Sequence, residues 1–277
     1  MSERIEPVPA LHDALLLLPA PARNVTAALL PVLPRGAEGL QARTSVASVA
    51  SRADTHICWR NPGAMAKIEP YEAHADRYDA WFERHEAAYI AELLALRPFV
   101  PLSGHGLEIG VGSGRFAAPL GVRVGIDPSR AMLGHARARG LDVLLGFALG
   151  LPFVYSRFDH VLVVTTLCFV DSPQAMLLQA RRVLRPGGDL VLGFIDRDSS
   201  LGRHYESHRE ASVFYRDATF YSAGEVERLL VEAGFDVRSW AQNLTHALAD
   251  DEQIEAARPG HGQGGFVVVH ARNDKVG

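Results

Sequence analysis

The feature that most constrains this 277-residue chain is an alternation of short apolar runs with segments of helical periodicity, which begins near residue 106. Apolar runs of about four to eight residues bounded by turn residues are typical of strands, and helices between successive strands favour a parallel sheet. The run DHVLVVTT is apolar on both faces, as a central parallel strand must be. The expected strands are residues 106–110, 122–127, 142–146, 159–166, 190–195, 236–242 and 265–271.

Helix signals separate most of these runs, but the last two strands have no helix between them, so one of them is expected to run antiparallel. The predicted fold class is α/β, with a doubly wound, mostly parallel seven-stranded sheet and an antiparallel strand near the C-terminus. The signals are an apolar pattern at residues 89–96 before Pro98, a short helix at about 115–120, Ser129 before a helix ending at Gly140, Ser172-Pro173, and a capping box at Ser222 and Glu225 before a helix ending at Gly234.

Residues 1–64 differ in composition from the rest of the chain. They hold seven of the 16 prolines, and no helical or alternating pattern persists between them apart from a short one at residues 11–18. We expect residues 1–64 to be a poorly ordered N-terminal extension and residues 65–277 to form the folded domain. A second hypothesis is that Met65 is the natural start, which N-terminal mass spectrometry of the native protein would test.

Composition argues against several classes of protein. A net charge of −4 gives no indication of a basic surface for nucleic acid. The 12 histidines are not spaced from acids or cysteines in the way that metal ligands are. Cys58 and Cys168 are too few for a disulfide framework or a structural zinc site and suit a reducing cytosol. No membrane span or secretory signal is evident. We expect a cytoplasmic monomer or homodimer with a small-molecule substrate and no bound metal.

The stretch LEIGVGSGRF places a glycine-rich turn directly after the first strand. Such turns often hold a phosphate, but the lysine of a P-loop is missing here, which argues against nucleoside triphosphate hydrolysis. A dinucleotide fingerprint can be laid on Gly112 and Gly114. Against it, Glu108 lies two residues before Gly110. Asp127 also follows Gly112 by only 15 residues, where about 20 is usual.

Four motifs in this order resemble those of class I S-adenosylmethionine-dependent methyltransferases: LEIGVGSGRF, VGIDPS, LPFVYSRFDHVLVV and RVLRPGGDLVLGF. The resemblance extends from about Tyr71 to the C-terminus. Within the class it is to the ubiquinone-biosynthesis-like group, methyltransferase type 11. The stretches VTTLCFVDSP and GFIDRDSSLGRHY resemble a subgroup in which some members are labelled small-amine N-methyltransferases. The resemblance implies a Rossmann-like sheet and S-adenosylmethionine as cofactor.

The resemblance also implies where this cofactor would lie. Glu108 would lie near the methionine ammonium, and Asp127 would accept hydrogen bonds from both ribose hydroxyls, because a carboxylate at the carboxyl end of a strand faces the crevice. Glycines in the turn would leave room for the methionine end. The other cofactor-binding residues expected are Gly110, Gly112, Gly114, Pro128, Met132, Phe147, Ala148, Leu149 and one of Thr165 and Thr166.

One motif departs from the family pattern. Many members have an acid-bearing Asp-Ala-Glu stretch where this chain has Phe147, Ala148 and Leu149. Phe147 and Leu149 could sandwich the adenine while backbone groups of Ala148 and Leu149 make the polar contacts. The departure could equally mean weaker cofactor binding.

The long segment at residues 196–221 is the expected acceptor side of the site. It shows no clean periodicity, and long loops at the carboxyl end of a sheet are often lids. His204, Tyr205 and Asp196 are candidates for a general base, although methyl transfer does not require one. Tyr78 and Trp81 resemble aromatic positions that cover the cofactor in relatives, with packing an equal alternative. We interpret Cys168 as a small buried residue.

The predicted function is methyl transfer from S-adenosylmethionine to a small organic acceptor through a nitrogen or oxygen nucleophile. Motifs for adenine N6 methylation, cytosine C5 methylation and arsenite binding are missing from the sequence. Two alternatives remain open at this point. One is an NAD(P)-binding oxidoreductase, and the other is a protein that binds S-adenosylmethionine without catalysis.

Overall fold

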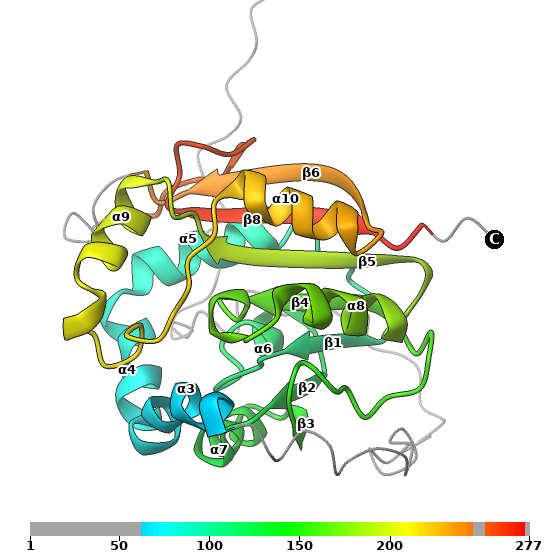
Figure 1. Cartoon of the computed structure of the whole chain (residues 1–277), viewed down its shortest axis with the longest axis horizontal. Coiled ribbons are helices and arrows are strands. Elements are labelled where there is room, and N and C mark those ends of the chain that lie inside the picture. Colours follow the sequence, from blue (N-terminus) through cyan, green and yellow to red (C-terminus); the bar gives the residue numbers. More distant parts are fainter. Residues whose placement is uncertain (1–61, 246–252, 275–277) are drawn as a thin grey trace, which may run out of the picture. The chain divides into compact units, whose positions relative to one another are not determined.

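A mixed β-sheet of eight strands forms the centre of the described part of the chain. The computed structural model describes residues 62–245 and 253–274, which lie within the compact unit Glu38–Gly277. The strand order is β3-β2-β1-β4-β5-β8-β6-β7 (Figure 1). The strands are β1 Gly106–Ile109, β2 Val124–Asp127, β3 Asp142–Leu145, β4 Phe158–Val164, β5 Leu184–Ile195, β6 Asp236–Asn243, β7 Arg258–Pro259 and β8 Phe266–Arg272.

The direction of the strands confirms the predicted fold class. β1 pairs in parallel with β2 and β4, β2 pairs in parallel with β3, and β4 pairs in parallel with β5. β8 runs antiparallel to both of its neighbours, β5 and β6. The strand beyond the predicted seven, β7, has only two residues, which is too short for any alternation to reveal it.

Helices connect most of the consecutive parallel strands, and several begin at the residues that the sequence indicates. The side chains of Ser129, Ser172 and Ser222 accept backbone hydrogen bonds at the starts of their helices, and Ser222 with Glu225 forms the complete capping box. The helices are α3 Pro62–Ala73, α4 Ala75–Arg84, α5 Glu86–Leu96, α6 Ala117–Leu120, α7 Arg130–Ala138, α8 Pro173–Val183, α9 Ser200–Ser207 and α10 Ala223–Glu232.

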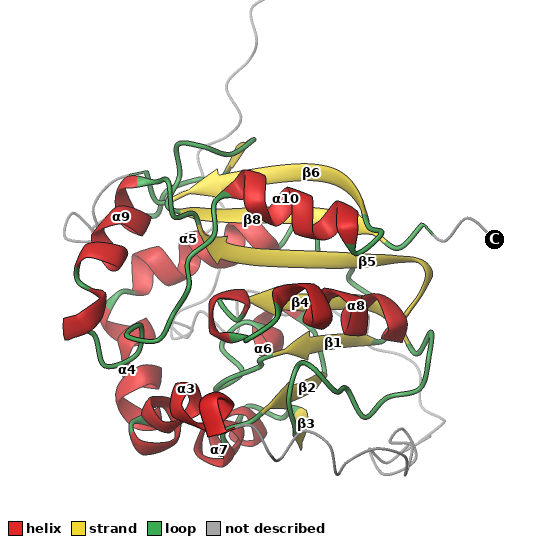
Figure 2. Ribbon diagram, viewed as in Figure 1, coloured by secondary structure: helices red, strands yellow, loops and turns green. Residues whose placement is uncertain are grey.

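The sheet is covered on both faces. α8 and α10 pack against each other and against β5 and β6, and their apolar residues join Leu190, Leu192 and Phe194 in the core. Side chains alternate between the two faces of a strand, so Gly193 faces the other side, where an added Cβ would meet Leu96 of α5. Figures 1 and 2 show α8 and α10 in front of the strands and α5 behind them. The described part of the chain therefore has three layers, with the sheet between two layers of helices.

Two segments differ from the sequence-based expectation. The predicted turn at residues 185–189 belongs to β5, where residues 185–188 bulge opposite Asp159 and Gly187 has φ of 72°. The segment at 196–221, expected to be irregular, contains α9 and a short 3₁₀ helix, Arg209–Ala211. Its helical face was hidden by the many polar residues. The pattern at residues 11–18 and nearly all of the proposed extension lie outside the described residues.

Candidate functional site

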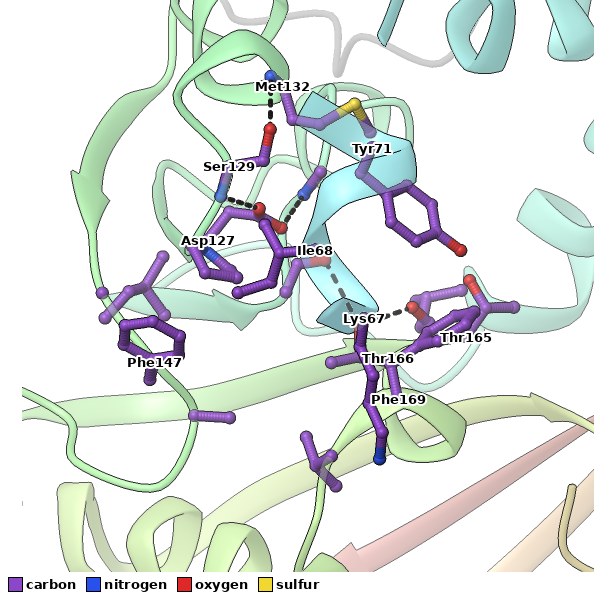
Figure 3. Close-up of a pocket in the computed structure, with 18 of the residues that line it drawn as sticks. Lys67, Ile68, Tyr71, Asp127, Ser129, Met132, Phe147, Thr165, Thr166 and Phe169 are labelled. Atoms are coloured by element: carbon purple, nitrogen blue, oxygen red, sulfur yellow. Dashed lines mark hydrogen bonds between the residues drawn. The ribbon is translucent and has the colours of Figure 1, made fainter. Parts of the chain in front are cut away.

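A cavity of about 390 Å³, here called the main cavity, opens at the carboxyl ends of β1, β2 and β4. Crevices at this end of an open α/β sheet are the usual ligand sites, because the connecting loops diverge there. Its walls come from α3, the glycine turn, the start of α7, residues 146–149 and the segment after β4. The structure thus brings three of the four sequence motifs to one place (Figure 3).

The three glycines of the turn have different neighbours. Gly110 and Gly112 line the main cavity with φ of 72° and 51°, in the left-handed region that favours glycine. A Cβ at Gly110 would collide with the Thr166 hydroxyl oxygen. Gly114 does not line the cavity, and a Cβ there would lie 2.7 Å from Leu141 and 3.2 Å from the backbone of Ala136. Gly114 therefore provides clearance for packing near α7.

Asp127, the last residue of β2, directs its carboxylate into the main cavity between the glycine turn and α7 (Figure 3). Its Oδ2 accepts a hydrogen bond from the Gly112 backbone N–H at 2.9 Å, and its Oδ1 accepts one from the Ser129 N–H at 2.8 Å. Burial raises the pKa of Asp127 to about 6, although these two N–H groups oppose the rise. The carboxylate is held in one orientation and keeps acceptor capacity for a ligand.

Glu108 lies beneath the turn and does not line the main cavity; it is 1% exposed. Its Oε2 has no hydrogen-bond partner among the described residues. Burial raises its pKa well above the ordinary value, and the Ala117 backbone N–H opposes that rise. A cationic ligand or an ordered water would supply the hydrogen-bond partner that this buried carboxyl oxygen lacks.

The opposite end of the main cavity is apolar. Pro128, Phe147, Ala148 and Leu149 all line it, and Met132 projects toward Gly112 from the first turn of α7. Figure 3 shows Phe147 on the far side of Asp127 from Thr165 and Thr166. A flat apolar ring system would be enclosed here without leaving buried polar groups unpaired.

Thr165 follows β4 and has φ of 47°, a conformation that β-branched residues rarely adopt. Its neighbour Thr166 donates a hydrogen bond to the Val164 carbonyl at 3.0 Å, and both threonines line the main cavity. Cys168 donates to the Thr165 carbonyl, and burial raises its thiol pKa to about 12. That pKa leaves little thiolate at neutral pH, so Cys168 is a poor nucleophile.

The first helix of the described residues, α3, forms one wall of the main cavity, and the sequence reasoning did not identify it. Lys67, Ile68 and Tyr71 line the cavity from α3. Lys67 forms an ion pair of 2.9 Å with Asp171 beyond β4. The only sequence signal was the organised pattern that begins near residue 69, and nothing in it indicates that this helix lies over the carboxyl ends of the strands.

A further network fixes the other end of α3. Glu72 accepts a hydrogen bond from the Ser129 hydroxyl at 2.7 Å and one from the Ala131 N–H at 3.2 Å. The Ser129 hydrogen bond is the main reason that the pKa of Glu72 is lowered. α3 is thereby fastened to the start of α7, next to Asp127.

A second cavity, of about 140 Å³ and here called the aromatic cavity, adjoins the main one. Tyr78, Thr165 and Tyr215 line both cavities. Tyr205 and Trp81 line the aromatic cavity only. Three of the aromatic side chains, Tyr205, Phe214 and Tyr215, come from the long segment after β5.

The remaining two base candidates lie elsewhere. His204 is exposed, and its ring lies against that of His208 with centroids 4.3 Å apart and the ring planes tilted by 31°. Asp196 is 2% exposed, and its Oδ1 accepts from the Asp198 N–H at 3.0 Å, so it organises the chain before α9. Neither residue lines either cavity. In the described ranges no helix is long and apolar enough to cross a membrane, and no group of three metal-ligating side chains occurs.

Comparison with known proteins identifies the family. Residues 107–192 match the methyltransferase domain family. A solved Thermotoga maritima structure, of an S-adenosylmethionine-dependent methyltransferase described as a possible histamine N-methyltransferase, is 42% identical with a TM-score of 0.72, covering 75% of this chain and 99% of that one. The chain belongs to the class I S-adenosylmethionine-dependent methyltransferase family. This membership decides against the NAD(P) oxidoreductase alternative.

Other relatives agree with this membership. An uncharacterized protein of Methanocaldococcus jannaschii is 41% identical over 201 residues, which are 73% of this chain and 97% of the relative. A demethylmenaquinone methyltransferase of Tropheryma whipplei is 32% identical over 169 residues, covering 52% of this chain and 71% of that protein. The protein is therefore an S-adenosylmethionine-dependent methyltransferase, and S-adenosylmethionine is its methyl donor.

The main cavity fits this donor. Asp127 retains acceptor capacity for hydroxyls, whereas Glu108, with its unpartnered Oε2, lies outside the lining of this cavity. The apolar wall at residues 147–149 suits an aromatic base. A Cβ at Gly112 would point toward Met132 at 3.2 Å, so a larger residue here would narrow the cavity.

Proposed function

We propose that this methyltransferase acts on a small organic acceptor through a nitrogen or oxygen nucleophile, with its donor bound in the main cavity. In this proposal Asp127 accepts from the ribose hydroxyls, Phe147 and Leu149 enclose the adenine, and Glu108 faces the ammonium directly or through water. Support comes from the carboxylate at the β2 end, whose two oxygens are oriented by the Gly112 and Ser129 N–H groups.

The main observation behind the proposal is that two cavities share a wall at Thr165, Tyr78 and Tyr215. When bound, S-adenosylmethionine supplies an activated methyl group on a sulfonium. An acceptor in the neighbouring cavity would supply the electron pair for the new bond to carbon, while the S–C pair stays on sulfur. The protein must align these partners and exclude water, and the apolar walls serve both purposes.

The proposed reaction assigns no general base. Burial raises the pKa of Tyr205 to about 12, which disfavours the tyrosinate that a base would require. His204 and Asp196 do not line the cavities. A proton on the attacking nitrogen or oxygen is therefore proposed to leave to solvent. The Thermotoga relative is described as a possible histamine N-methyltransferase, which supports a nitrogen acceptor.

The test of the donor site is calorimetric titration with S-adenosylmethionine, S-adenosylhomocysteine and NADH. Asp127→Ala removes the proposed ribose acceptor, and Gly112→Val places a side chain into the cavity at a φ of 51°. Each substitution should weaken S-adenosylmethionine binding at least about tenfold, or about 1.4 kcal/mol.

The matched control is Asp142→Asn, an exposed acid at the start of β3. It should leave the affinity unchanged, and circular dichroism should show that all variants are folded. Unchanged affinity in folded Asp127→Ala would refute the proposed donor site. Turnover in a panel of amines, phenols and carboxylic acids, measured as S-adenosylhomocysteine release, then separates nitrogen from oxygen acceptors.

A further inference from the structure

The aromatic cavity has the position that a methyl acceptor requires. It meets the main cavity at Tyr78, Thr165 and Tyr215, next to the end of β4. Its volume of about 140 Å³ is small. A buried cavity of roughly 150 Å³ holds a molecule of the size of benzene. The space therefore suits an acceptor built on one ring.

Aromatic side chains dominate the wall of this cavity. The rings of Tyr78 and Phe82 lie 5.4 Å apart and those of Tyr78 and Phe214 lie 5.5 Å apart, both edge to face. Tyr205 and Tyr215 are 4.9 Å apart. Several ring faces around one space attract a positively charged group through their quadrupoles. The full aromatic set is Tyr78, Trp81, Phe82, Phe116, Tyr205, Phe214 and Tyr215.

Charge in the wall favours the same kind of ligand. Glu92, in the middle of α5, lines the aromatic cavity and is 6% exposed. Its charge contributes to raising the pKa of Tyr78, Tyr205 and Tyr215, although burial is the larger cause for each. A negative potential therefore reaches rings around the cavity. An anionic ligand would be repelled there, whereas a cation would be attracted.

Two cations also belong to the wall, and both lie toward solvent. Arg77 and Arg84 are exposed, in contrast to Glu92. The Arg77 guanidinium lies 5.9 Å from the centroid of the Phe214 ring, so a ring of this cavity already faces a cation. Solvent screens the exposed arginines more than it screens the buried acid. Glu92 thus has the greater influence inside the cavity.

We propose that the aromatic cavity is the acceptor site and that it selects a one-ring organic amine, which binds in its ammonium form between Glu92 and the surrounding ring faces. The ammonium loses a proton to solvent before the freed nitrogen pair forms the bond to the methyl carbon, and the S–C pair stays on sulfur. This inference rests on the proposed function, because it assumes that the donor lies in the main cavity. It goes further by assigning Glu92 and the aromatic rings to acceptor selection and by disfavouring phenols and carboxylic acids as acceptors.

The test uses three probes of nearly equal size that differ in charge: benzylamine, benzyl alcohol and benzoate. Each is titrated calorimetrically into the protein saturated with S-adenosylhomocysteine. Benzylamine should bind at least about tenfold more tightly than either of the other two. Equal binding of benzylamine and benzyl alcohol would overturn the proposal. Tighter binding of benzoate would also overturn it and would show that Arg77 and Arg84 dominate the electrostatic potential in the cavity.

Glu92→Gln removes the charge and keeps the shape, so it should abolish most of the preference for benzylamine over benzyl alcohol. Glu86→Gln, an exposed acid on the same helix, is the matched control and should retain the preference. Phe214→Leu tests the ring contribution separately, in case the Glu92 variant does not fold, and should reduce the same preference. A retained preference in folded Glu92→Gln contradicts the role of this residue.

S-adenosylhomocysteine affinity, measured in the same samples, distinguishes the two proposals. Glu92→Gln and Phe214→Leu should leave it unchanged, because neither residue lines the main cavity. If the wild-type protein binds S-adenosylhomocysteine in the proposed donor site but shows no preference for benzylamine, the acceptor inference alone fails. If the Asp127→Ala variant keeps full donor affinity, the proposed function fails first.

Discussion

At the residue scale, Asp127 combines a structural and a proposed binding role. Its oxygens accept from Gly112 and Ser129, which couples the glycine turn to the start of α7. Burial nevertheless raises its pKa to about 6, so its charge state is sensitive to pH within a few units of neutrality. A ligand that donates hydrogen bonds to this carboxylate favours the ionised form.

This gives a pH prediction. The raised pKa means that Asp127 takes up a proton as the pH falls through about 6, and the protonated carboxyl is a weaker acceptor for two hydroxyls. S-adenosylmethionine affinity should therefore be highest above pH 6 and should fall below it, approaching a tenfold loss per pH unit in the one-proton limit. Calorimetric titration at pH values between 5 and 8, in steps of about one pH unit, measures this affinity. Asp127→Asn should flatten the profile; an unaltered slope in this variant would assign the proton to another group.

Asp79 shows how one residue can stabilise two separate elements. Its carboxylate accepts from Arg115 at 2.9 Å and 2.7 Å and from Arg139 at 2.7 Å, joining α4 to the glycine turn and to the end of α7. Burial alone would raise its pKa, but the two guanidinium groups hold the pKa well below the ordinary value.

Asp79→Asn should therefore reduce the free energy of unfolding by about 3 kcal/mol at neutral pH, since it removes the acid that both partly buried arginines share and leaves Arg115 only the exposed Glu83. Because the folded pKa is lowered, the contribution of Asp79 is present above the unfolded value near about 4 and is lost as the pH falls through the folded pKa. Urea unfolding at neutral and acidic pH measures both effects. The exposed Asp142→Asn variant should change little at either pH.

At the scale of elements, α3 closes one side of the main cavity through contacts at both of its ends. Lys67 pairs with Asp171 beyond β4, and Glu72 binds Ser129 and Ala131 at the start of α7. The Lys67 and Asp171 side chains are 22% and 33% exposed, so the pair contributes little to global stability. We expect this ion pair to determine instead how firmly α3 is held against the main cavity.

Lys67→Met should increase the dissociation rate of S-adenosylmethionine about two- to fivefold, the equivalent of losing about 0.5–1 kcal/mol of local stabilisation. Stopped-flow displacement measures that rate, and thermal unfolding should be nearly unchanged. Arg238→Met removes an ion pair with Asp236 on β6, away from the cavity, and serves as the matched control. Equal dissociation rates in Lys67→Met and the wild type would show that this contact does not hold the wall.

At the scale of the whole molecule, the relatives bear on the domain proposal. The Thermotoga structure matches 75% of this chain over 99% of its own length. The Methanocaldococcus relative matches 73% of this chain over 97% of its own length. Part of this sequence is thus enough to match nearly the whole length of each relative. We therefore propose that residues 65–277 hold the complete methyltransferase domain and that residues 1–64 are an extension.

A chain that begins at Met65 should fold and bind S-adenosylmethionine with an affinity within about threefold of the full chain, because Lys67, Ile68 and Tyr71 of the cavity wall are retained. Titration calorimetry of the two chains side by side measures this, and circular dichroism checks the fold. A loss of binding in the folded shorter chain would assign residues 1–64 a part in the site.

Local signals account for what could be predicted from the sequence. The apolar runs predicted the parallel strands because buried strands need apolar residues on both faces. Ser129, Ser172 and Ser222 marked helix starts because capping uses a side chain and a backbone group three residues apart. Asp127 was placed at the end of a strand for the same local reason. The short strand β7 and the helix α9 carry too little apolar periodicity to be predicted.

The sequence by itself therefore determined the α/β sheet, the glycine turn and the acid at the end of β2, since each depends on residues close together in the chain. Only the tertiary structure decided that α3 closes the main cavity and that Gly114 serves packing near α7. It also decided that α4, α5 and the segment after β5 surround one small aromatic space. Contacts between different elements depend on how the helices pack on the sheet, and that packing leaves no periodic trace in the sequence.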